Sequence, residues 1–143
     1  MSPVDKEIVK RKMAIIVRNL KALERVHGCT REEYERDFYM RKATERLLQE
    51  LIEAAIDINT HIIMESGAMV PDSYYESFLE LASLKILPAD VARSLAPSAG
   101  LRNRLVHEYD TIDDAVVHAA VSEAIGLYTD YLRAIQRHID APT

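Results

Sequence analysis

Apolar side chains recur along this chain at alternating intervals of four and three residues. In the first 27 residues the series is Val9, Met13, Ile16, Leu20 and Leu23. This spacing places the apolar positions on one face of a helix, because an α-helix has about 3.6 residues per turn. Similar series run from residue 48 to 62 and from 117 to 135. Since no segment of useful length alternates with a period of two, the pattern predicts helices and no sheet.

Capping residues mark where these helices begin. A Ser or Thr precedes an acidic residue by three positions at Ser2, Thr30, Ser73 and Thr111. Pro88 indicates a further start, while Gly28 and Gly67 stand where helix C-caps are expected. The predicted helices therefore span residues 3–27, 31–66, 73–86, 88–109 and 112–139.

The fourth helix contains a proline that interrupts it. Pro97 cannot donate an intrahelical hydrogen bond, and Gly100 weakens the helix further. We expect a break near residues 96–100 and a short separate helix over 101–109. The apolar seams of the three longest helices favour shallow crossings of about 20°. The predicted fold is all-α, an antiparallel up-and-down bundle of about five helices.

Composition supports this fold and narrows the class of protein. With 143 residues, 48% of them hydrophobic and 29% charged, the chain is long enough to bury a core without metals or disulfides. We therefore expect residues 1–143 to form a single domain. One cysteine, Cys29, permits no intrachain disulfide, and no apolar run is long enough to span a bilayer. These features predict a cytoplasmic protein with no membrane partner.

Charge is distributed unevenly along the chain. The net charge of −5 argues against a protein that holds nucleic acid mainly by bulk electrostatics. Residues 5–25, however, carry seven basic and three acidic side chains. This basic side of the first helix is either an ordinary solvated face or a surface that contacts nucleic acid.

A polar group lies on the long second helix, where Glu53, Asp57 and His61 follow one another at steps of four. Acids and a histidine on one helix face can bind a divalent metal. The competing interpretation is the solvated face of an amphipathic helix, which we favour, so we expect no metal site. Asp57 and His61 remain candidates to line a cleft if this helix forms a subunit contact.

The segment "RNRLVHEYD", residues 102–110, places polar side chains among apolar neighbours. Arg102 lies about 140° around the helix from His107, so the two do not share a face, whereas Asn103 and His107 do. An arginine in an apolar stripe needs either an acid on a neighbouring helix or an anion at a cleft or subunit interface. His107 is either structural or a group that transfers protons near neutral pH. Tyr109, taken by itself, reads as an aromatic side chain packed at a corner.

Together these residues match a specific pattern. Arg102, His107 and Tyr109 form an R-x4-H-x-Y motif that resembles the signature of HepT-type toxins in the HEPN superfamily. The resemblance covers nearly the whole chain, including the basic first helix, "DINTHII", "PDSYYESFLEL" and the closing helix. It implies an all-helical protein that forms a homodimer, with the motifs of both subunits at the shared interface.

The resemblance also implies an activity. Members of the family act as metal-independent endoribonuclease toxins of type VII toxin–antitoxin systems, with RNA as substrate and no cofactor. It assigns acid–base catalysis to His107, stabilisation of the phosphoryl oxygens to Arg102 and a supporting role to Asn103. Tyr109 would accept AMP groups from an MntA-like nucleotidyltransferase antitoxin, which would block the site.

A second class of function stays open beside the toxin. The chain would then be a non-catalytic helical subunit that binds a nucleotide or presents substrate to a nucleotidyltransferase. Arg102 would hold phosphate, and His107 would be structural. A growth assay of the wild type against His107→Ala, without the partner, separates these two functions.

Overall fold

The computed structural model describes residues 1–142, except for the side chain of Val4. It contains seven helices and, among those residues, no strand. The helices are α1 (Pro3–His27), α2 (Arg31–Arg36), α3 (Phe38–Glu65), α4 (Tyr74–Ser83), α5 (Ala89–Leu95), α6 (Ser98–His107) and α7 (Asp114–Asp140). The predicted all-α class is confirmed.

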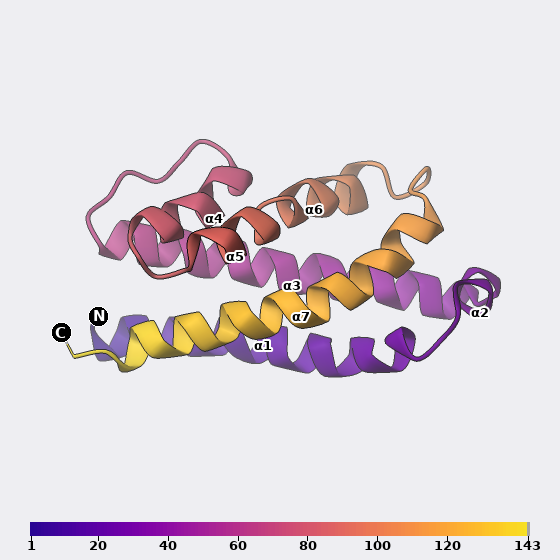
Figure 1. The fold of residues 1–143 in the computed structure, drawn as a ribbon, viewed down its shortest axis with the longest axis horizontal. Coiled ribbons are helices and arrows are strands. Elements are labelled where there is room, and N and C mark those ends of the chain that lie inside the picture. Colours follow the sequence, from indigo (N-terminus) through magenta and orange to yellow (C-terminus); the bar gives the residue numbers. More distant parts are fainter. Residues whose placement is uncertain (143) are drawn as a thin grey trace.

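Three long helices form the body of the bundle (Figure 1). Helix α1 packs against both α3 and α7, and the chain direction in α1 is opposite to that in the other two. Helices α4, α5 and α6 return the chain to the end at which α7 begins, so the N- and C-termini lie at the same end. Helices α4 and α6 cover α3, while α5 contacts α7. This path confirms the antiparallel up-and-down topology.

The predicted second helix, residues 31–66, is wrong as one continuous element. It is divided at Asp37, whose backbone is extended, with φ −105° and ψ 98°. The Asp37 side chain accepts a hydrogen bond of 2.9 Å from the backbone N–H of Met40 and so caps a new helix. Helix α2 is anchored by the buried ring of Tyr34, which lies 5.4 Å from the ring of His118 on α7.

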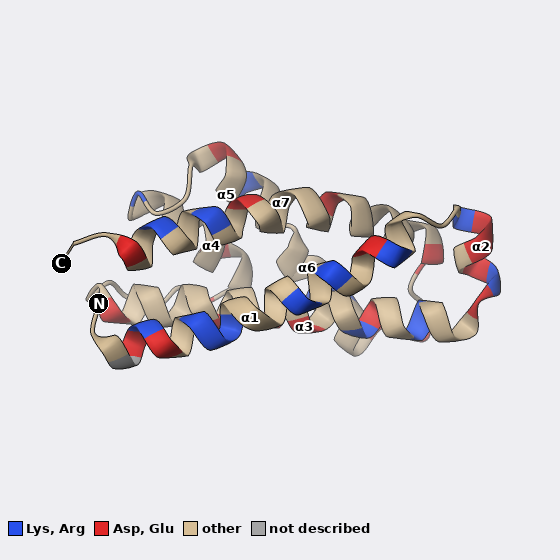
Figure 2. Ribbon diagram, turned by 90° about the horizontal axis from the view of Figure 1, so that it is seen from below, with Lys and Arg blue, Asp and Glu red and all other residues tan. Residues whose placement is uncertain are grey.

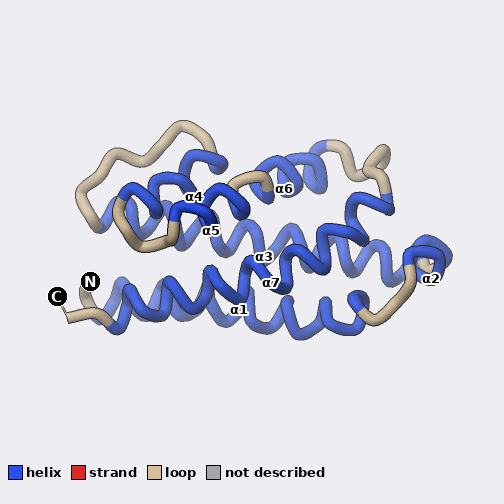
Figure 3. The backbone as a smooth tube through the Cα atoms, in the orientation of Figure 1, coloured by secondary structure: helices blue, strands red, loops and turns tan. Residues whose placement is uncertain are grey.

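Other boundaries shift by a few residues. The break at Pro97 is confirmed, but α6 resumes at Ser98 and includes Gly100. Helix α4 ends at Ser83, short of the predicted residue 86, and Lys85 then adopts a φ of 62° in the turn. The tube in Figure 3 shows these interruptions as loops between helices.

Thr111 was predicted to cap the last helix, and this is wrong. Asp113 caps α7 instead, because its side chain accepts the backbone N–H of Ala115 at 2.9 Å. The Thr111 hydroxyl donates to the carbonyl oxygen of Glu108. The caps predicted at Ser2, Thr30 and Ser73 are confirmed.

Buried side chains from all seven helices form one core cluster. A polar chain of hydrogen bonds crosses this core. The hydroxyl of Tyr131 on α7 contacts Asn59 Oδ1 at 2.6 Å, and Asn59 Nδ2 donates to the hydroxyl of Ser77 on α4 at 3.2 Å. Ser77 in turn donates to the backbone carbonyl of Tyr74 at 2.7 Å. The chain thereby fixes the start of α4, which bears Tyr74, relative to α3.

Candidate active site

Helix α6 presents the R-x4-H-x-Y motif because of how it packs. Its buried residues, Ala99 and Leu105, direct one side of the helix toward the core. The same orientation turns Arg102 toward α3 and leaves Asn103 and His107 exposed. The expectation that Arg102 and His107 do not share a face within one chain therefore holds.

Arg102 meets the acid that its position among apolar residues requires. Its guanidinium lies 3.9 Å from a carboxylate oxygen of Glu53 on α3 and 5.4 Å from the centre of the Tyr74 ring. One terminal nitrogen also donates to Asn103 Oδ1 at 3.1 Å. The Nε–H of Arg102 is buried and has no hydrogen-bond partner among the described residues. The guanidinium is thus held in place from three sides, by Glu53, Tyr74 and Asn103.

A small cavity of about 130 Å³ opens beside this guanidinium, lined by Glu53, Ile56, Asp57, Tyr74 and Arg102. Two carboxylates in its wall oppose anion binding. Asp57 is neutralised in part, because Lys12 Nζ on α1 lies 2.9 Å from its carboxylate. Asp57, one of the two candidates for lining a cleft, therefore lies beside Arg102.

His61, the other cleft candidate, lies apart from this cavity. Its Nε2 is 2.8 Å from an Asp5 carboxylate oxygen at the start of α1. The pKa of the Asp5 carboxyl is lowered mainly by its hydrogen bond with the Ser2 hydroxyl, and the His61 ring lowers it further. Across residues 1–142 no three His, Cys, Asp or Glu side chains are grouped so that they could hold a metal ion. Glu53, Asp57 and His61 instead have separate partners.

The histidine of the motif occupies the last position of α6. His107 is exposed, and its imidazole makes no hydrogen bond within the described part of the chain. Asn103 is one turn earlier, but its amide oxygen accepts from Arg102 and not from the imidazole. Within one chain, therefore, Asn103 orients the guanidinium rather than the histidine.

Tyr109 lies in the turn after α6 and is 62% exposed. It lines a cavity of about 310 Å³ together with Leu105 and Val106 of α6 and with four polar side chains of α3, namely Lys42, Glu45, Arg46 and Gln49. Burial raises the pKa of the Glu45 carboxyl, which Lys42 partly offsets from 3.7 Å. The exposed Tyr109 therefore shares its cavity with two cations, Lys42 and Arg46.

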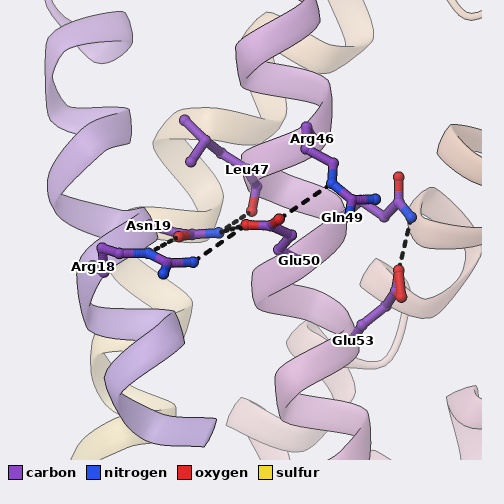
Figure 4. Close-up of polar contacts among 7 residues, drawn as sticks. All are labelled: Arg18, Asn19, Arg46, Leu47, Gln49, Glu50 and Glu53. Carbon is purple, nitrogen blue, oxygen red and sulfur yellow. Dashed lines mark hydrogen bonds and ion pairs between the residues drawn. The ribbon is translucent and has the colours of Figure 1, made fainter.

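Sequence reasoning missed the α3 and α4 side chains of this region. Lys42, Arg46 and Tyr74 carried no motif, and only their positions in the fold bring them beside α6. Figure 4 shows a related cluster between α1 and α3, in which the Glu50 carboxylate receives hydrogen bonds from Asn19 at 3.0 Å and from Arg46 at 3.2 Å. The step of four from Glu50 to Arg46 was the signal for the second contact.

No helix among the described residues is long and apolar enough to cross a membrane.

Comparison with known proteins gives consistent matches. Residues 16–137 match the family Ribonuclease HepT-like. A tRNA nuclease HepT from Aphanizomenon flos-aquae is 38% identical over 139 residues, which cover 97% of this chain and 95% of the relative. An mRNA nuclease HepT from Shewanella oneidensis is 33% identical over 113 residues, covering 78% of this chain and 84% of the relative.

A solved structure matches as well. It is the tri-AMPylated Shewanella oneidensis HEPN toxin in complex with MNT antitoxin, which superposes with a TM-score of 0.82 at 27% identity over 95% of this chain and 98% of that one. The family match covers most of the chain, and the fold agrees over nearly all of it. The chain belongs to the Ribonuclease HepT-like family of the HEPN superfamily.

Proposed function

We propose that this chain is the endoribonuclease toxin of a toxin–antitoxin pair, with Arg102 and His107 as its catalytic residues and Asn103 in support. Membership of a ribonuclease family gives the class of enzyme. The observation that carries the residue assignment is the state of Arg102, a largely buried guanidinium that is fixed by Glu53, Tyr74 and Asn103 and lines a small cavity.

The chemistry follows from these groups. The 2'-hydroxyl of one nucleotide attacks the adjacent phosphate, and the 5'-oxygen of the next nucleotide leaves. This produces a cyclic phosphate and a free 5'-hydroxyl. One proton leaves the attacking oxygen and one reaches the departing oxygen, and His107 transfers one of them. Arg102 donates to the phosphoryl oxygens, where negative charge develops. No step needs a metal, and DNA, which lacks the 2'-hydroxyl, is not cleaved.

We propose that a homodimer brings Arg102 of one subunit close to His107 of the other. Arg102 and His107 of one chain point in different directions, so one phosphate reaches both groups most simply between two copies. Mixing Arg102→Ala and His107→Ala subunits tests this arrangement. If the site combines two chains, mixed dimers regain one intact site, and an equimolar mixture recovers about a quarter of the wild-type rate. No recovery after verified subunit exchange would mean that each chain supplies both residues.

Regulation rests on Tyr109. We infer that a nucleotidyltransferase antitoxin transfers AMP to its exposed hydroxyl, as the AMPylated relative suggests. The added phosphate would lie beside Lys42 and Arg46 and occupy space that RNA needs. Tyr109→Phe should stay toxic, while the antitoxin no longer neutralises it or adds AMP mass to it.

The central experiment measures cleavage of total RNA and purified tRNA in EDTA by the unmodified chain. Arg102→Ala and His107→Ala should each lower the rate about 100-fold or more. Arg104→Ala and His27→Ala are matched controls, since Arg104 is on the same helix and His27 is also an exposed residue at a helix end. If the folded wild type cleaves neither RNA, and wild type and His107→Ala are equally harmless in cells, the chain is the non-catalytic subunit instead.

A further inference from the structure

A third cavity lies on a side of α3 adjacent to the one that lines the Tyr109 cavity. It has a volume of about 590 Å³ and is lined by the C-terminal half of α1 and the N-terminal part of α3. Its apolar wall includes Met40, Ala43 and Leu47, and Lys21 and Arg25 of α1 also line it. The ring of Tyr39 lines the cavity as well. An apolar wall, an aromatic ring and two cations are the elements with which proteins hold single-stranded nucleic acid.

Tyr39 is the most unusual member of this set. Its side chain is 83% exposed, and the neighbouring Phe38, which it meets edge-on with ring centres 5.7 Å apart, is 55% exposed. Neither ring belongs to the buried core. A ring that stands free at the mouth of a cavity is available to stack on a base.

Lys21 and Arg25, the two cations that line the cavity, differ in their ion pairing from the cations earlier on α1. Lys12 and Arg18, earlier on α1, pair with Asp57 at 2.9 Å and Glu50 at 3.4 Å. Lys21 and Arg25 form no ion pair with any residue in the described range 1–142. Figure 2 shows basic segments repeated along α1, with acidic segments among them. Local positive charge attracts a polyanion even on a chain of net charge −5, because the field near a surface is set by its nearest charges.

One acid, Asp37, lines the same cavity. Its carboxylate is engaged as the N-cap of α3, where it accepts the Met40 N–H at 2.9 Å. The charges that line the cavity therefore sum to +1, with the negative one directed at the helix end.

Helix α3 lines both this cavity and the Tyr109 cavity of the candidate active site. Tyr39, Ala43 and Leu47 line this cavity, while Lys42 and Arg46, on the adjacent side of the same turns, line the Tyr109 cavity. Lys42 and Arg46 are exposed as well, and they pair with Glu45 at 3.7 Å and Glu50 at 3.2 Å.

We propose that the α1–α3 cavity binds a single-stranded segment of the substrate RNA next to the cleaved bond. Tyr39 stacks on one base, and Lys21 and Arg25 contact the phosphates beside it. The inference rests on the proposed ribonuclease function, of which it names the substrate-binding surface.

The test compares Tyr39→Ala and Lys21→Gln/Arg25→Gln with matched controls on other helices, Tyr75→Ala and Arg93→Gln/Arg137→Gln, which also replace exposed side chains. Binding of a single-stranded RNA is measured on the His107→Ala background, so that cleavage does not interfere. Tyr39→Ala should weaken binding roughly 5- to 100-fold, with Tyr39→Phe restoring it. The Lys21/Arg25 variant should lower the salt dependence by about 1.4 in log–log slope, for two phosphate contacts. Unchanged thermal melting verifies folding.

Cleavage separates this inference from the function on which it rests. With the native His107, the variants should raise KM on a long RNA and leave cleavage of a dinucleotide unchanged. RNA affinities within twofold of the controls would overturn the proposal. So would a loss of antitoxin binding with RNA binding intact, because the surface would then be a protein interface. If RNA binding falls as expected while no variant or wild type cleaves, the binding surface stands and the nuclease function fails.

Discussion

The buried hydroxyl of Tyr131 offers a sharp test of the core that carries the site. Tyr131→Phe keeps the ring and its contacts with Phe78 and Tyr128, at 6.2 and 5.8 Å between ring centres. It removes the O–H that lies 2.6 Å from Asn59 Oδ1 and 3.1 Å from the Ala55 carbonyl. Ala55 is within α3 and retains its helical bond, but Asn59 Oδ1 is left without a donor in the core.

An unsatisfied buried acceptor costs about 1–3 kcal/mol. For a chain of this length the melting temperature should fall by roughly 3–10 °C. Urea unfolding followed by circular dichroism, at one fixed protein concentration, measures the free-energy change, and the m-value should not move. Tyr75→Phe is the control, since Tyr75 is exposed and makes no hydrogen bond through its side chain among the described residues.

A double variant tests whether the loss of stability comes from the unpaired Asn59 oxygen. Adding Asn59→Leu to Tyr131→Phe replaces both partners with apolar groups and should recover part of the lost stability. If Tyr131→Phe alone costs less than about 0.5 kcal/mol, the hydroxyl contributes little and the polar chain does not fix α4.

Two further changes test the surroundings of α6. Tyr74→Leu removes the ring that stacks with the Arg102 guanidinium and should lower the rate of RNA cleavage about two- to fivefold, as measured by single-turnover kinetics. Tyr74→Phe keeps the ring and should retain the rate. Equal losses in both variants would mean that the hydroxyl of Tyr74, and not its ring, supports cleavage. Glu45→Gln concerns pH: burial raises the pKa of this carboxyl in the folded chain, so its ionisation opposes folding and the wild type loses stability relative to the variant as pH rises above about 4.5. Denaturation at pH 4 and pH 7 should show the difference between the two proteins only at the higher pH, and a difference of opposite sign would mean that the Lys42 ion pair outweighs burial.

The order of the helices was predictable because its signals are local. Caps at Ser2, Thr30 and Ser73 act within one turn, and Pro97 interrupts a helix wherever the chain goes. The same local reasoning failed at Asp37, since an aspartate in a polar helical segment is read equally well as a surface residue or as a cap. It failed again at Thr111, where Asp113 competes for the same role two residues later.

The sequence by itself determined the helical class, the amphipathic faces and the R-x4-H-x-Y motif, because periodicity, capping and motif spacing are properties of neighbouring residues. Only the tertiary structure decided that Arg102 faces Glu53 and Tyr74, that Asn103 holds Arg102 and not His107, and that Lys42 and Arg46 stand beside Tyr109. It likewise decided that Lys21 and Arg25 share a cavity with Tyr39. These pairings join residues far apart in the chain, and their proximity depends on how helices pack, which no local pattern encodes.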